Sequence, residues 1–255
     1  MPRLRSRLPR VASLAGVACS LCAALACGPR ITVETVDAPV DEAPVEDGGK
    51  DPGPSPEREA VLAVARGYAD ALTQRDPERA AELVVAETFV FYDDLRRAAL
   101  TSKAEDLERW PLMPLIMVLE LRVRFSRAEL EAFDGRSLFT AAVEAGLAGE
   151  DIGDLLDDPS VEVAHTEDDH AELRVEQSSL LYLRRDPDPE VDADAGAQAP
   201  WRVDLPGLIE ALGPSIEALA KERVETSGKL RTALYFVALR LDVALDPAIL
   251  DGPLR

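Results

Sequence analysis

Apolar residues recur at helical spacing along the first regularly patterned part of the chain. The recurring positions are Val61, Ala65, Tyr68 and Leu72. Ser55-Pro56-Glu57 stands just before them and combines a capping residue, a proline suited to a first turn and an early acid, so a helix is expected to begin there. Asp76-Pro77 breaks this helix and caps a second one, and Glu87 to Thr101 predicts a third.

The middle of the chain is predicted to be mainly helical. Leu115 to Phe125 is an almost unbroken apolar run whose Leu and Met content favours a buried helix, although its Val-Arg-Phe end keeps a strand open. Ser126 with Glu129 is a capping-box pattern that opens a short helix. Further helical stretches are expected over Gly135 to Gly146 and Asp151 to Leu156.

Apolar and polar residues then alternate with period two, which predicts strands. The alternating apolar positions are Val161, Val163, Leu173, Val175, Leu181 and Leu183. A turn from Thr166 to Asp169 separates the first two strands, and a long acidic loop from Asp186 to Ala199 precedes a last strand at Trp201 to Leu205. Helices are expected to follow over Leu208 to Glu222 and Thr226 to Val243. The strands therefore predict an antiparallel meander of three or four members.

These patterns together predict an α+β fold. Residues 56–245 are expected to form a single domain, because about 200 residues are enough for one sizeable core. Residues 246–255 are expected to be a proline-bearing tail. Aromatic residues make up only 5% of the chain, so the core must be built from Leu, Val and Ala.

Residues 1–26 have the pattern of a secretory signal peptide. Four arginines precede an uncharged apolar run from Val11 to Ala26, which is shorter than the roughly twenty residues that a membrane-spanning helix needs. Ala24-Leu25-Ala26 fits the small-x-small cleavage site of an ordinary exported protein. The same residues followed by Cys27 resemble the lipobox of bacterial lipoproteins, in which the cysteine is acylated and becomes the mature N-terminus.

The positions of the cysteines favour the lipoprotein interpretation. Cys19 and Cys22 lie inside the predicted leader, so the exported chain would keep Cys27 alone. A lone thiol cannot form an internal disulfide, whereas a cysteine at the first position suits lipid attachment. The resemblance implies a permanent anchor of several acyl chains, palmitate among them. Gly28 in second position implies the outer membrane, facing the periplasm or the cell surface. Residues 27–55 are thus expected to be the lipidated cysteine and a disordered acidic tether.

Charge narrows the range of partners. The formal net charge is −20, and removal of the leader with its four arginines and no acids changes it to −24. Such a surface repels nucleic acid and anionic lipid headgroups, so no nucleic-acid partner is expected. The expected partners are the membrane, through the lipid anchor, and an envelope protein or a small apolar ligand.

Two groups of residues have metal-binding chemistry, and each has a simpler explanation. His165 and His170 flank the predicted turn and would face each other across two strands, but a metal needs a third, fixed ligand that an acidic turn does not supply. The second group is the alternating acids Asp186, Asp188, Glu190, Asp192 and Asp194. These acids lack the spacing, the glycine and the final glutamate of the twelve-residue calcium loop. We therefore expect neither a metal nor a cofactor.

Two helices, a helical middle and a meander ending in a Trp-Arg-Val-Asp-Leu strand resemble the nuclear transport factor 2-like (SnoaL-like, cystatin-like) domains. The residues that carry the resemblance are Ala65 to Leu72, Arg75 to Glu78, and Trp201 to Leu205. The resemblance implies helices packed on one face of a curved antiparallel β-meander around a conical pocket. This chain would add a helical insertion in the middle and extra C-terminal helices. The family hosts isomerases, dehydratases and domains without known activity, so it hardly constrains function.

The resemblance also implies one set of catalytic candidates. Members similar to ketosteroid isomerase carry a pocket tyrosine on the first helix, where this chain has Tyr68, and a carboxylate base, for which Asp70 or Asp204 could be proposed. Tyr68 on an apolar stripe is more typical of a core residue, and no catalytic residue is assigned. We expect a non-enzymatic, membrane-anchored envelope lipoprotein that binds a partner or a small apolar ligand. The alternative is an isomerase- or dehydratase-like enzyme that uses the conical pocket.

Overall fold

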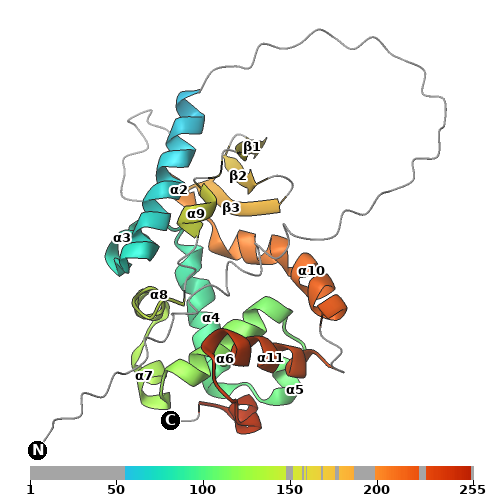
Figure 1. Ribbon diagram of the computed structural model, residues 1–255. Coiled ribbons are helices and arrows are strands. Elements are labelled where there is room, and N and C mark those ends of the chain that lie inside the picture. Colours follow the sequence, from blue (N-terminus) through green and yellow to red (C-terminus); the bar gives the residue numbers. More distant parts are fainter. Residues whose placement is uncertain are drawn as a thin grey trace, which may run out of the picture.

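The computed structural model describes residues 55–147, 152–156, 158, 160–167, 169–175, 178–186, 199–223 and 228–253. The predicted leader, Cys27 and the tether up to residue 54 lie outside these residues, as do the acids from Asp188 to Asp194. Within the described residues the fold is α+β, with many helices and a four-stranded antiparallel sheet (Figure 1). The predicted fold class is confirmed at this level.

The first helices begin where the sequence places them. They are α2 (Pro56–Gln74), α3 (Pro77–Glu82) and α4 (Glu87–Thr101). The side chain of Ser55 accepts a hydrogen bond from the backbone N–H of Arg58 at 3.1 Å, and Asp76 accepts one from Arg79 at 3.1 Å. These bonds satisfy donors that the first turn leaves without intrahelical partners. The buried face of α2 includes all four residues of the predicted apolar stripe.

All the elements described in the middle of the chain are helices. Its helices are α5 (Ala104–Leu107), α6 (Leu112–Arg124), α7 (Arg127–Ala132), α8 (Gly135–Glu144) and α9 (Ile152–Leu156). The apolar run at 115–125 is therefore a helix and not a strand. It begins at Leu112, three residues before the predicted start, because Pro114 is tolerated in a first turn, where its missing N–H has no intrahelical partner. The short helix α5 was not predicted.

The sheet contains β1 (Val161–Glu167), β2 (His170–Val175), β3 (Ser178–Arg185) and β4 (Trp201–Val203) in the order β1-β2-β3-β4. Leu173 pairs with Leu181, Leu183 pairs with Val203, and all four side chains are buried. A parallel bridge between Val84 and Val203 adds the chain after α3 to the edge of β4, which the sequence did not predict. This bridge connects the N-terminal helices directly to the last strand.

The C-terminal elements are α10 (Leu205–Arg223), α11 (Lys229–Leu241) and the 3-10 helix η2 (Pro247–Asp251). The predicted start of α10 at Leu208 is wrong, and so is the predicted extension of the last strand to Leu205. The side chain of Asp204 accepts a hydrogen bond from the N–H of Gly207 at 3.0 Å, so Asp204 caps the helix three residues earlier than predicted. The helix α11 is also shorter than the predicted range from Thr226 to Val243.

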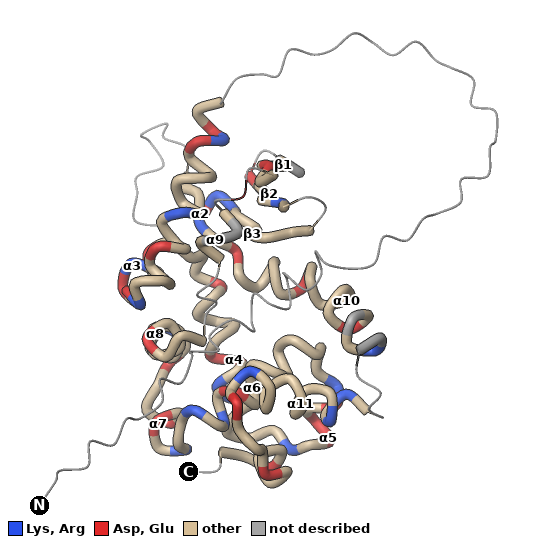
Figure 2. The backbone as a smooth tube through the Cα atoms, viewed as in Figure 1, with Lys and Arg blue, Asp and Glu red and all other residues tan. Residues whose placement is uncertain are grey.

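In Figure 1 the strands lie beside α2 at one end of the molecule, α6, α11 and η2 lie at the other end, and α4 and α10 run between them. Helix α6 is central, because it contacts α4, α10, α11 and η2. One cluster of buried apolar side chains extends from α2 to η2. Figure 2 shows acidic and basic residues spread along most elements, with basic positions at the end of α10 and the start of α11. That junction is where the candidate site lies.

Candidate functional site

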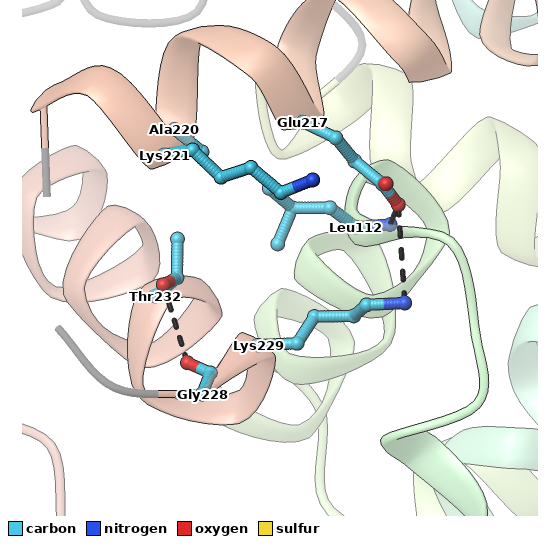
Figure 3. A pocket seen from close by; sticks show the side chains of 7 residues that line it. All are labelled: Leu112, Glu217, Ala220, Lys221, Gly228, Lys229 and Thr232. Carbon is cyan, nitrogen blue, oxygen red and sulfur yellow. Dashed lines mark hydrogen bonds and ion pairs between the residues drawn. The ribbon is translucent and has the colours of Figure 1, made fainter.

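A pocket with a volume of about 260 Å³ opens where the end of α10, the start of α11 and the start of α6 meet (Figure 3). Its described lining residues are Leu112, Glu217, Ala220, Lys221, Gly228, Lys229 and Thr232. Two of the four lysines in the chain therefore line one small cavity. In a chain with a net charge of −20, this concentration of ammonium groups marks the pocket as chemically distinct.

Helical spacing explains why α10 directs three side chains into this space. Glu217, Ala220 and Lys221 stand at i, i+3 and i+4, so they lie on the same face of α10. Ala220 is almost fully buried, and its methyl group is too small to fill the gap between the helices. From α11, the hydroxyl of Thr232 donates a hydrogen bond to the carbonyl of Gly228 at 3.2 Å, one turn earlier in the chain. The small side chains leave this space unfilled, and the long side chains border it.

Glu217 and Lys229 interact across one end of the pocket. Glu217 Oε1 accepts a long hydrogen bond of 3.4 Å from the backbone N–H of Leu112 and lies 3.8 Å from Lys229 Nζ. Pro111, which precedes the first turn of α6, makes no side-chain cap, so Glu217 supplies a carboxylate there from another helix. Lys229 Nζ also donates to the carbonyl of Trp110 at 2.9 Å. This ammonium is thus held between a carbonyl and a carboxylate.

Lys221 is differently placed, because it is an exposed residue at the rim of the pocket. In Figure 3 its ammonium points into the pocket, toward the end where Glu217 and Leu112 stand. It forms no hydrogen bond or ion pair with the part of the chain that the structure describes. Among the described residues, the lining therefore contains two ammonium groups, one carboxylate and the hydroxyl of Thr232. Leu112, Ala220 and the methylene stems of the lysines supply apolar surface.

A second hollow, with a volume of about 650 Å³, lies between the start of α2 and β4. The cationic side chain in its described lining, Arg185, already interacts with other groups. The guanidinium of Arg185 stacks over the ring of Trp201 at 4.4 Å, donates to the carbonyl of Ala199 at 2.8 Å and pairs with the carboxylate of Glu57. We interpret this cluster as the connection of α2 to the edge of the sheet.

The structure gives each residue of the isomerase-like set a different place. Tyr68 is fully buried, and burial, together with the neighbouring Tyr92, raises its pKa well above the ordinary value. Asp70 is exposed, and Asp204 caps α10. Neither of the two hollows is lined by any of these three residues. The predicted core position of Tyr68 is confirmed.

The two histidines are not paired with each other across the strands, contrary to the prediction. His165 pairs with Ala171 and His170 pairs with Glu167, because an irregularity between His165 and Glu167 shifts the register of β1 against β2. The turn consequently has two residues instead of four. His170 Nδ1 lies 2.7 Å from a carboxylate oxygen of Asp169, and this hydrogen bond lowers the pKa of Asp169. Among the described residues, no three His, Cys, Asp or Glu side chains form a metal-binding group.

Asp186 is the only one of the five alternating acids that falls within the described residues. Its carboxylate accepts a hydrogen bond from the N–H of Ala86 at 3.4 Å and lies 3.8 Å from Arg202 Nε. It therefore connects the start of α4 to β4, next to the bridge between Val84 and Val203. This position indicates a structural role for Asp186.

The pocket residues were not predicted from the sequence. One available signal was the spacing of Glu217 and Lys221 on a single helical face, and another was the proximity of Lys221 and Lys229 in a chain with four lysines. Comparison of the chain with protein-family models, with curated proteins and with solved structures found no match. No described helix is long and apolar enough to cross a membrane. A functional proposal therefore depends on the pocket and the sequence.

Proposed function

We propose that the protein is a membrane-anchored envelope lipoprotein whose folded part is a non-enzymatic binding domain, and that the pocket between α6, α10 and α11 is its binding site. The sequence of the leader carries the anchor, and the observation that carries the binding site is the ammonium of Lys221, an exposed residue that points into the mainly apolar pocket and binds no described residue. Small-molecule sites typically combine an apolar lining with a few placed polar groups. The pocket has this combination.

The lining favours binding over catalysis, because among the described residues its one unbonded charged group, Lys221, has no carboxylate or histidine partner to exchange a proton with. A general acid or base must be able to reach a substrate and exchange a proton with it. Glu217 and Lys229 are held by each other and by backbone groups, and Thr232 donates to a carbonyl of its own helix. The alternative, an isomerase- or dehydratase-like enzyme, requires Tyr68 in an accessible pocket, whereas Tyr68 is only 1% exposed.

The proposal includes a nuclear transport factor 2-like arrangement, with helices on one face of a curved meander. Contacts of α2 with β1 and β4, and of α10 with β3, support it. In that arrangement α6 belongs to the helical insertion, and α10 and α11 are the extra C-terminal helices. The lysine-lined pocket is then formed by the added elements and not by the conical pocket of the family. Its ligand need not resemble those of the family.

The anchor is tested separately from the pocket. Cells that produce the protein are labelled with radioactive palmitate, and the protein is recovered and examined for label. We expect the parent chain to be labelled and the Cys27→Ser variant to carry no label, because acylation requires the thiol. Label that persists on the variant would rule out Cys27 as the attachment point.

The pocket is tested by filling it. Ala220→Leu adds a side chain into the cavity, and Ala218→Leu adds the same side chain to an exposed position of α10 and serves as the matched control. Each protein is purified from its native envelope, and the small molecules that copurify are measured by mass spectrometry. We expect a molecule that accompanies the parent and the control and falls at least tenfold in Ala220→Leu. Equal recovery from all three proteins would contradict the proposed site.

A further inference from the structure

We infer that the pocket binds a monocarboxylate on a short apolar chain and that Lys221 holds the carboxylate. This inference rests on the proposed function, because it names the ligand class of the same pocket. It is supported by the balance of charge, by the backbone donors at the site, by the carboxylate that the protein itself places there, and by the size and lining of the cavity.

The described lining residues leave one positive charge in excess. Lys221 and Lys229 contribute two positive charges, and Glu217 contributes one negative charge. Because Glu217 is near Lys229 and not bonded to Lys221, the excess positive charge resides at Lys221. A monocarboxylate neutralises this excess. A phosphate dianion would leave a net negative charge beside Glu217, and a cation would be repelled by Lys221.

The start of α11 adds backbone donors to the same site. This helix has thirteen residues, and no side chain caps its first turn. Its N-cap residue Gly228 has φ = 106°, and no atom of the described residues lies within 4 Å of where a Cβ atom would stand, so these residues leave the backbone open to a ligand. The first N–H groups of a helix and its dipole favour a negative charge at that end. The helix start and Lys221 both border the pocket, and each favours a negative charge in it.

The protein already places a carboxylate in the pocket by a comparable contact. Glu217 Oε1 stands at the first N–H of α6, at 3.4 Å from Leu112 N, and near the ammonium of Lys229. The start of α11 borders the pocket from another side, whereas the ammonium of Lys221 points toward Leu112 and Glu217 (Figure 3). Neither has a side-chain carboxylate partner among the described residues. A ligand carboxylate would pair with Lys221 as Glu217 pairs with Lys229.

The volume and lining set the length of the ligand. A cavity of about 260 Å³ holds roughly eight non-hydrogen atoms at about 30 Å³ each, the volume of a water molecule in the liquid. Hexanoate has that number of atoms. Its alkyl chain would contact Leu112 and Ala220, which are buried and apolar. Each added methylene is expected to raise affinity about fourfold until the cavity is full.

The experiment is a calorimetric titration of the exported protein with sodium butanoate, pentanoate, hexanoate and octanoate. Concentrations reach about 20 mM, because a small ligand with one charged contact is expected to bind in the millimolar range. We expect affinity to rise to hexanoate and then stop rising. Hexanol should bind at least tenfold more weakly, and hexylamine should show no measurable binding. Hexanol or hexylamine binding as well as hexanoate would overturn the anion assignment.

Two variants identify the residue that holds the carboxylate. Lys221→Met keeps most of the stem and removes the charge, so hexanoate affinity should fall at least tenfold, as expected for loss of a hydrogen bond to a charged group. Lys221→Arg should remain within about threefold of the parent. Arg231→Met removes an exposed charge from the first turn of α11 without altering the lining, and should change affinity less than about twofold. Equal losses in Lys221→Met and Arg231→Met would overturn the role of Lys221.

The outcome separates this inference from the proposed function. If hexanoate does not bind at all, the ligand class is wrong. If the filled variant Ala220→Leu nevertheless loses the molecule that copurifies with the parent, the pocket still functions as a binding site for another ligand. If hexanoate does not bind and filling the cavity changes nothing, both the ligand class and the binding site are refuted.

Discussion

Arg122 connects two segments that are distant in the sequence, and its replacement should destabilise the protein strongly. Its side chain is fully buried and donates only to backbone carbonyls. On the α4 side it binds Ala98 at 3.0 Å, Ala99 at 2.9 Å and also Ser102. On the C-terminal side it binds Ile249 at 2.9 Å and Leu250 at 2.7 Å. The guanidinium therefore holds η2 against the end of α4.

The size of the effect follows from two opposing terms. Each hydrogen bond from a charged donor contributes about 1.5–3 kcal/mol, and Arg122 makes five. Desolvation of a buried charge costs several kcal/mol. Burial accordingly lowers the pKa of Arg122 to about 10, which still leaves it charged at neutral pH. Arg122→Met keeps most of the buried stem but leaves the carbonyl oxygens without their donor. We therefore expect the free energy of unfolding to fall by about 3–5 kcal/mol, from a total of about 5–15 kcal/mol.

The assay is urea unfolding of the exported protein, followed by tryptophan fluorescence. Arg124→Met is the matched control, because Arg124 belongs to the same helix and is exposed, and it should change stability by less than about 0.5 kcal/mol. A chain that ends at Asp246 lacks two of the five acceptors, so its loss and that of Arg122→Met should combine to less than their sum. The reasoning fails if Arg122→Met costs less than about 1 kcal/mol, or if the two losses are additive.

Two further predictions concern α6 and α8. Burial raises the pKa of Glu120, although Arg240 opposes this by donating to both of its oxygens at 3.0 Å. The folded state thus holds a proton on Glu120 at a pH where the unfolded chain has released it, so this group adds stability as the pH falls through that range. Glu120→Gln should remove this contribution to the dependence of the unfolding free energy on pH, measured from about pH 7 to 4.5. An unchanged pH dependence would contradict the assignment. A Cβ on Gly135 would lie 1.9 Å from the carbonyl oxygen of Phe89, so Gly135→Ala should cost at least about 3 kcal/mol in urea unfolding. Gly67→Ala, inside α2, would meet no described side chain closer than 3.5 Å and should gain about 0.5–1 kcal/mol; similar effects of the two alanines would refute the close approach of α8 to α4.

Short-range chemistry explains which parts of the fold could be predicted from the sequence. Ser55, Asp76 and Ser126 each bind a backbone N–H three residues later, so the signal and its effect lie within one helical turn. The same chemistry explains the error at Asp204. Aspartate is rare in strands and common at helix caps, but the period-two pattern that begins at Trp201 continues through Asp204 and predicts a strand there. Local capping prevailed over the period-two pattern.

Long-range contacts explain what could not be predicted. In the sequence, Glu120 and Arg122 interrupt an apolar run and give no sign of burial. In the structure both are buried, and their partners in the C-terminal elements lie more than 100 residues later. No local pattern specifies such a partner. The pocket has the same origin, because Leu112 and Lys229 come from segments that only the packing of the helices brings together.

Helix α6 contacts the C-terminal elements through Arg122, Glu120 and Leu112, and these contacts differ in strength. Arg122 and Glu120 bind η2 and α11 through buried groups at distances of 3.0 Å or less. At the other end of α6, Leu112 binds Glu217 at 3.4 Å, and the carboxylate and its lysine partner are each about one-third exposed. Exposed ion pairs contribute little to stability, whereas buried charged networks are costly to break. The junction should therefore open most easily at the pocket, so that a ligand can displace weak contacts there without disturbing the core.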